Sequence, residues 1–138
     1  DPALLPPLFV AYRTDLKEGS EVFHNNLRQR FNQGDRDVVD AMERFADYAH
    51  RSRQALLEGR PNDVGPLMDA NFDLRASISR ISERNMEMIR IGREHGASVK
   101  YSGSGGAVIG VYPDDTVYRR LVESYTRAGF KIFKPRIV

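Results

Sequence analysis

KYSGSGGAVIGVYP, from Lys100 to Pro113, is the stretch around which the rest of the chain is organised. Two short apolar segments flank the glycine-rich residues 103–106, a pattern that predicts a strand, a turn and a second strand. Glycine permits the positive φ angles of a tight turn. Small residues also let a backbone approach a ligand closely, with amides that can face an anion. The stretch by itself leaves both roles open.

The loop does not match the common nucleotide-binding patterns. A Walker-A loop continues with Lys and Ser or Thr after its last glycine, whereas Ala107 and Val108 follow Gly106. A dinucleotide fingerprint needs a third Gly or Ala where Val108 stands, and a helix where a strand is predicted. The sequence therefore excludes these two kinds of phosphate loop.

Working outward, hydrophobic periodicity and turn residues divide the chain into nine elements. Their order is β-α-α-α-α-β-β-α-β. We predict strands and helices at 7–13, 20–31, 35–57, 62–78 (capped by Asn62), 82–94, 98–102, 107–113, 114–129 (capped by Asp114 or Asp115) and 130–138. Two split β-α-β halves fit this order. We therefore predict one α+β domain over residues 1–138, a ferredoxin-like antiparallel sheet with helices packed on one face.

Composition narrows the function classes. With 41% hydrophobic and 29% charged residues, the 138-residue chain is typical of a globular domain. The net charge is +2 and the basic residues are scattered, so we expect no nucleic-acid partner. No apolar run reaches the ~20 residues of a membrane span, and no membrane partner is expected. Without cysteine, thiolate chemistry is excluded, and a cytoplasmic location is the default expectation.

Few side chains point to chemistry. His24, His50 and His95 are isolated, so no metal site is predicted. Asn71 and Arg75 lie four residues apart and share one face of a helix with apolar neighbours. They either join a buried network, such as a salt bridge to Asp73 or Glu87, or present a ligand face on which Arg75 binds a carboxylate or phosphate. Asn85 is interpreted as a helix cap or a crevice hydrogen bond.

Four blocks of the sequence resemble the GHMP kinases. KYSGSGGAVI is similar to their third motif, a Lys-x-[Ser/Thr]-Gly-[Ala/Ser]-Gly-Gly strand–turn–strand. Within the superfamily, the blocks resemble those of glucuronokinases. ALLPPL is similar to SLLPPL, LMDANFDLR to LMNLNFDIR, RNMEMIRIGREHGA to MNIEMVEVARRVGA, and KYSGSGGAVI to KFTGSGGAVV. The chain departs from the family by lacking an FGDD-like turn before Ser82 and by a loose match over 14–31.

This resemblance implies the C-terminal domain of a kinase that phosphorylates the anomeric hydroxyl of a sugar, with glucuronate as the favoured acceptor. Its implied partners are a small-molecule sugar and the N-terminal domain, which would bind most of the ATP and Mg²⁺ and carry the catalytic acid. No catalytic residue is then expected in this chain, and the chain alone should be inactive. Because its first residue is Asp1 and not Met, we also expect it to be a piece of a longer or processed protein.

The resemblance also implies site residues. Residues Ser102, Gly103, Ser104, Gly105 and Gly106 would line the acceptor side of the cleft. We add the hypothesis that Asn71, Asp73 and Arg75 contact the sugar. Two alternatives remain: another GHMP kinase, of heptose-phosphate, fucose or mevalonate type, and a non-catalytic ferredoxin-like ligand-binding module.

Overall fold

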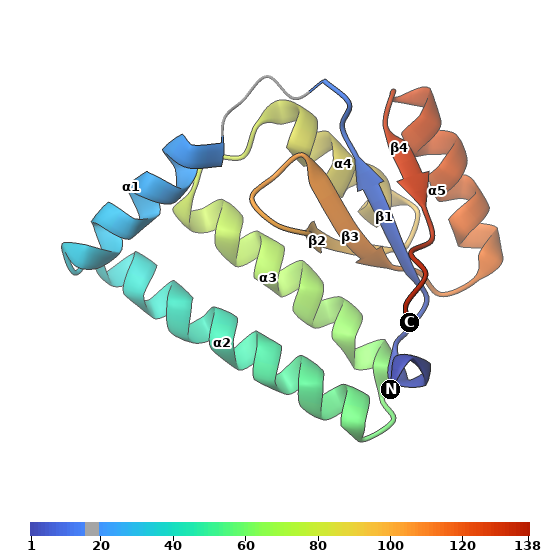
Figure 1. The fold of residues 1–138 in the computed structure, drawn as a ribbon, viewed down its shortest axis with the longest axis horizontal. Helices are drawn as coiled ribbons and strands as arrows, with labels where there is room; N and C mark the ends of the chain where they lie inside the picture. Colours follow the sequence, from blue (N-terminus) through green and yellow to red (C-terminus); the bar gives the residue numbers. More distant parts are fainter. Residues whose placement is uncertain (16–19) are drawn as a thin grey trace.

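The computed structural model describes the backbone of residues 1–15 and 20–138 and the side chains of residues 1–15 and 26–138. Its elements follow the predicted order (Figure 1). They are β1 (Leu8–Tyr12), α1 (Ser20–Asn32), α2 (Arg36–Leu57), α3 (Val64–Ile78), α4 (Glu83–Glu94), β2 (Ser98–Tyr101), β3 (Ala107–Val111), α5 (Asp115–Arg127) and β4 (Lys131–Phe133), with short 3-10 turns at Pro2–Leu4 and Pro61–Asp63.

The four strands form one antiparallel sheet in the order β2-β3-β1-β4. β1 lies between β3 and β4, with Leu8 opposite Val111 and Ala11 opposite Ile132. The first and last strands of the chain are therefore neighbours, as two interleaved β-α-β halves require. The predicted α+β, ferredoxin-like architecture is confirmed.

The main core lies between the sheet and the helices α4 and α5. Side chains alternate along the strands, so that Phe9, Val99 and Val108 are fully buried on one face. Tyr125 of α5 and Met88 of α4 meet them there, and the Tyr125 hydroxyl donates to the Met88 carbonyl oxygen at 2.7 Å. Burying an aromatic or aliphatic side chain of this size contributes roughly 1.5–3 kcal/mol.

A second layer extends from the β2 edge of the sheet. There α3 lies beside β2, where the Asp69 carboxylate accepts a hydrogen bond from the Val99 amide at 3.0 Å. On the far side of α3, α2 runs alongside it (Figure 1). A small cluster of Ala41, Leu74 and Ile78 joins the two helices. Arg75, in the last turn of α3, donates to the Gly103 carbonyl oxygen at 3.0 Å, so this end of α3 lies close to the turn between β2 and β3.

Two details of the sequence prediction are wrong. Asn62 does not cap α3, because Pro61–Asp63 form a 3-10 turn and Asp63 occupies the N-cap position without a side-chain bond. The last strand is three residues long and ends before Pro135, a residue that has no amide hydrogen for sheet pairing.

Of the two residues predicted as alternative caps of α5, Asp114 is the cap. Its carboxylate accepts a hydrogen bond from the Val117 amide at 2.9 Å. In the described part of the chain, no helix combines the length and apolarity needed to cross a membrane.

Candidate functional site

The glycine loop, residues 102–106, connects β2 to β3 and is fixed at both ends. The Ser102 amide donates to the Ala107 carbonyl oxygen at 3.1 Å, and the Gly106 carbonyl oxygen accepts from the Arg13 amide at 2.8 Å. Gly105 and Gly106 have φ angles of +133° and +76°, which residues with a Cβ atom rarely adopt. The predicted tight turn is therefore present.

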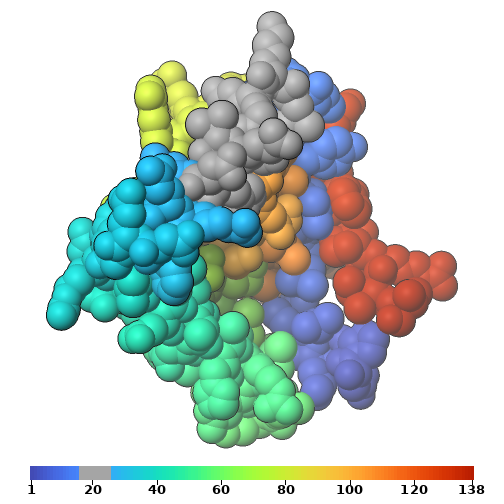
Figure 2. All heavy atoms as spheres, turned by 60° about the vertical axis from the view of Figure 1, so that its left-hand side comes forward, coloured from blue at the N-terminus to red at the C-terminus, as the bar shows by residue number. Residues whose placement is uncertain are grey.

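The middle of the loop keeps its amides available. Among the described residues, the amides of Gly103, Ser104 and Gly105 have no hydrogen-bond acceptor. Gly103 is exposed and Ser104 and Gly105 are half-buried. In Figure 2 the orange segment that contains the loop reaches the surface between the helical layer and β1. Consecutive free amides with partial positive charge can face an anion, so the loop is a turn that could also hold one.

Arg75 brings a cation to this loop from the last turn of α3. Its Nη1 atom donates to the Gly103 carbonyl oxygen at 3.0 Å, and its guanidinium lies 4.8 Å from the centre of the Tyr101 ring. Burial lowers the pKa of Arg75. Burial, and then the charge of Arg75, also lower the pKa of Lys100 at the start of the motif. Arg75 therefore contacts the loop directly, whereas Lys100 donates from Nζ to the Tyr101 carbonyl oxygen at 2.7 Å, immediately before the loop.

The other two predicted sugar-binding residues lie differently. Asp73 is exposed, and its Oδ1 atom pairs with Arg93 of α4 at 2.8 Å. Asn71 is half-buried, and its side chain has no hydrogen-bond partner among the described residues. Glu87, the other predicted salt-bridge residue, pairs with Arg84 at 2.7 Å. The structure thus brings Arg75 to the glycine loop and directs Asp73 towards α4; contact of these residues with a sugar stays a prediction.

Sequence reasoning missed Arg13 and did not connect Asn85 to the loop. In the described part of the chain these are the only buried polar or charged residues, each 9% exposed. The Asn85 Oδ1 atom accepts from the Gly106 amide at 3.2 Å and from Arg13 Nη1 at 3.5 Å. Arg13 Nε donates to Asp15 at 3.1 Å. Nothing local signals this cluster, because Arg13 lies 72 positions before Asn85, and Asn85 lies 21 positions before Gly106.

We expect the Arg13–Asp15 ion pair to make the free energy of unfolding depend on pH in the acid range. The hydrogen bond from Arg13 lowers the pKa of Asp15 in the folded protein. Its contribution is therefore complete above the unfolded pKa, about 3.9, and is lost as pH falls through the lowered folded value. Urea unfolding of the protein and its Asp15→Asn variant should show a difference in free energy at about pH 7 that shrinks towards about pH 2.5.

Asp47→Asn is the matched control for this experiment, because it removes an exposed pair with Arg51 on α2. We expect a smaller change from it at neutral pH. A difference between Asp15→Asn and the unmodified protein that stayed constant over the acid range would contradict the assigned pKa direction.

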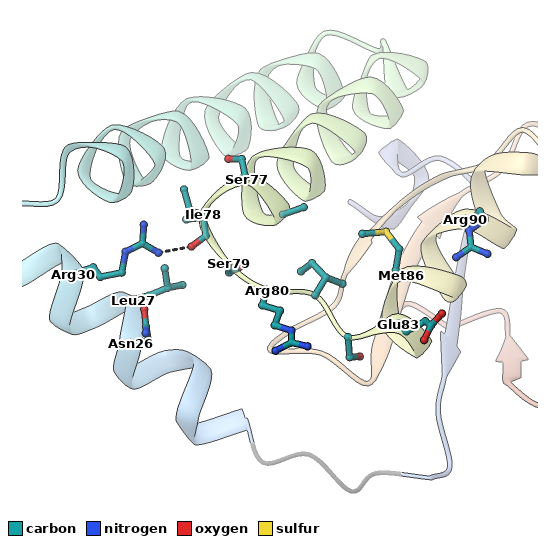
Figure 3. A pocket seen from close by; sticks show the side chains of 13 residues that line it. Asn26, Leu27, Arg30, Ser77, Ile78, Ser79, Arg80, Glu83, Met86 and Arg90 are labelled. Atoms are coloured by element: carbon teal, nitrogen blue, oxygen red, sulfur yellow. Dashed lines mark hydrogen bonds between the residues drawn. The ribbon is translucent and has the colours of Figure 1, made fainter.

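A groove of about 1100 Å³ opens next to the cluster of Arg13, Asn85 and Gly106. It lies between α1, the α3–α4 connection and the start of α4 (Figure 3). Arg30 closes one side of it by donating to the Ile78 carbonyl oxygen, a bond drawn in Figure 3. Ser82 lines the groove and its hydroxyl lies 3.4 Å from Arg13 Nη1, so the groove borders the residues that hold the glycine loop.

Comparison with known proteins identifies relatives over most of the chain. The family model described as "GHMP kinases C terminal" matches residues 52–129. "Probable glucuronokinase 2" of Arabidopsis thaliana is 34% identical over 135 residues, which are 96% of this chain and 37% of that protein. "Glucuronokinase 1" of the same plant is 34% identical over 136 residues, with the same coverage. The chain thus spans about 37% of the length of these relatives.

Solved structures share the fold at lower identity. L. major mevalonate kinase in complex with R-mevalonate has a TM-score of 0.79 at 18% identity, over 96% of this chain and 44% of that one. The Streptococcus pneumoniae phosphomevalonate kinase has a TM-score of 0.73 at 17% identity, over 96% of this chain and 41% of that one. The Lin0012 protein of Listeria innocua reaches 0.82 at 14% identity, over 93% and 38%. These likenesses concern the fold alone.

Proposed function

The chain belongs to the GHMP kinase family as its C-terminal domain, and on that premise we propose that it forms the acceptor side of an ATP-dependent sugar kinase. The reaction would transfer the γ-phosphoryl group of MgATP to the anomeric hydroxyl of the sugar. The observation that carries this proposal is the glycine loop, which has three available amides, a carbonyl oxygen bound by Arg75, and Lys100 bonded to the Tyr101 carbonyl oxygen just before it.

Phosphoryl transfer depends mainly on positioning and on neutralising the charge that spreads over the transferred group. Backbone amides and half-buried cations are suited to both, because they are held rigidly and are only partly screened by water. The loop is short and anchored at both ends, so its amides keep one orientation. In our proposal this loop orients the acceptor hydroxyl and stabilises the developing negative charge.

For the acceptor we propose a uronic acid, with glucuronate as the first candidate. The two curated relatives carry the name glucuronokinase, which motivates this choice. A uronate has a carboxylate that a guanidinium can bind through two parallel hydrogen bonds. We propose that Arg75 is that partner, and that Asn71 and Asp73 contact sugar hydroxyls.

ATP and Mg²⁺ would be bound mainly outside this chain. The described residues contain no group of three His, Asp or Glu side chains that could hold a metal ion. The matched relatives are also much longer than this chain. We therefore propose that an N-terminal domain of the same protein supplies the nucleotide loop, the metal ligands and the catalytic acid.

A panel of acceptors tests the proposed function. The full-length protein is incubated with MgATP and glucuronate, galacturonate, glucose, fucose, a heptose phosphate or mevalonate, and ADP formation is measured. Phosphorylation of a uronate at the anomeric position is the expected result, with no turnover by residues 1–138 alone. Preference for another acceptor would show that the protein is a GHMP kinase with a different substrate. Turnover of none would favour a non-catalytic ligand-binding module.

Arg75→Ala should raise the KM for glucuronate roughly 10- to 100-fold, because a charge-assisted hydrogen bond contributes about 1.5–3 kcal/mol. Steady-state kinetics of the full-length enzyme measure this effect, with the KM for ATP as an internal reference. Arg127→Ala is the matched control, since Arg127 is an exposed arginine of α5 paired with Glu123. An unchanged KM for glucuronate in Arg75→Ala would remove Arg75 from the acceptor site.

A further inference from the structure

Asn85 occupies an unusual place for a polar side chain. It lies in the first turn of α4, is 9% exposed, and directs its Oδ1 atom to the Gly106 amide at 3.2 Å. Gly106 is itself buried, so water does not replace this acceptor readily. Arg13 Nη1 approaches the same oxygen at 3.5 Å. Two donors converge on one atom, which fixes the amide group with its oxygen towards the loop.

We propose that Asn85, supported by Arg13, is a positioning residue that sets the conformation of the glycine loop for phosphoryl transfer. This inference rests on the proposed function, because that function places the loop on the acceptor side of the cleft. Asn85 acts through the loop and does not itself touch the reacting atoms.

The first step is how Asn85 selects the loop conformation. By accepting from Gly106, its oxygen turns that amide into the protein, away from the three amides that stay available. Its Nδ2 atom lies against Gly105, where an added Cβ would be only 3.2 Å away. Asn85 therefore binds the amide of Gly106 through its oxygen and packs against Gly105 through its nitrogen. A loop without this acceptor has a buried, unpaired amide and is expected to change conformation.

The second step is what holds Asn85. Its backbone amide donates to the Ser82 hydroxyl at 3.3 Å, which is the N-cap bond of α4. Arg13 Nη1 lies 3.4 Å from the same hydroxyl, and Arg13 Nε is paired with Asp15. The backbone amide of Arg13 also donates to the Gly106 carbonyl oxygen at 2.8 Å. The end of β1, the start of α4 and the loop are thus joined in one buried cluster, so the loop follows rigid elements.

Kinetics of the full-length enzyme test the proposal. Asn85→Leu keeps the approximate volume but removes the acceptor, and we expect kcat to fall roughly 10- to 100-fold with a smaller change in the KM for ATP. Asn85→Asp keeps an acceptor for both donors and should retain kcat within about threefold. Asn85→Ala serves if the leucine variant does not fold. Val38→Ala, a fully buried position on α2, is the control for general loss of stability.

The pattern of the three results decides the matter. A large drop in Asn85→Leu, or in Asn85→Ala where that replaces it, with retention in Asn85→Asp and Val38→Ala supports the positioning role. Equal losses in the leucine and aspartate variants, a loss in Val38→Ala as large as in Asn85→Leu, or no loss in any variant would overturn it.

Hydrogen exchange separates this proposal from the proposed function. The exchange of the peptide covering residues 102–107 is measured in the unmodified protein and in the Asn85 variants. We expect faster exchange in Asn85→Leu and Asn85→Ala, and near-native exchange in Asn85→Asp, whatever the acceptor panel shows. Unchanged exchange in all variants would refute the role of Asn85 even in an active kinase. An inactive protein with the expected exchange would refute the kinase and keep the loop assignment.

Discussion

Gly110→Ala is expected to lower the free energy of unfolding by about 3 kcal/mol or more, because overpacking a rigid core forces backbone shifts. A Cβ atom at Gly110 would lie 2.3 Å from Cε1 of Phe9 and 2.8 Å from the carbonyl oxygen of Ser98. Phe9 is fully buried, with its ring centre 5.9 Å from that of Tyr125 and 6.3 Å from that of Tyr112. It therefore has no room to move aside.

The carbonyl oxygen of Ser98 is equally constrained, because it belongs to the strand paired with β3. Urea denaturation of the protein measures the effect. Gly103→Ala is the control: a Cβ there has no neighbour within 4 Å, so stability should change by less than about 0.5 kcal/mol. Equal stability of Gly110→Ala and the unmodified protein would show that β1 and β3 pack less closely than described.

On the proposed function, Gly105→Ala is expected to reduce kcat/KM of the full-length protein about 100-fold. The φ angle of +133° is strained for alanine by roughly 1–3 kcal/mol, and the new Cβ would press on the Asn85 amide. The loop should relieve both by moving, and a displacement of about 1 Å near reacting atoms can cost 100-fold in rate. Steady-state kinetics with the preferred acceptor measure the loss.

Gly34→Ala separates this loss of activity from a loss of stability. Gly34 also has a positive φ, +76°, but a Cβ there meets no atom within 4 Å and the residue lies in the turn between α1 and α2. We expect it to lose about 1 kcal/mol of stability and to keep its activity. If the two variants lost activity equally, the effect of Gly105→Ala would be attributed to folding and not to the loop.

The site was only partly predictable. The glycine loop was found from composition, and Arg75 from its place on a helix face. The partners of Arg75 were not, since its bond to the Gly103 carbonyl oxygen joins residues 28 positions apart. Arg13 carried no signal at all, because a charged residue at the end of a strand is normally exposed. Here the start of α4 and the loop cover it.

The sequence alone determined the order of the elements, most of their boundaries and the family. Those properties depend on local information: hydrophobic period, capping residues such as Asp114, glycines with positive φ, and short ordered motifs. Only the tertiary structure decided which polar groups meet. The convergence of Arg13, Asn85 and Gly106 depends on how β1, α4 and the β2–β3 turn pack, and that packing comes from the apolar core beneath them. The hydrophobic effect that drives this packing is non-directional, so apolar residues do not specify which distant polar groups they will bring together. Local sequence patterns therefore cannot reveal these polar contacts.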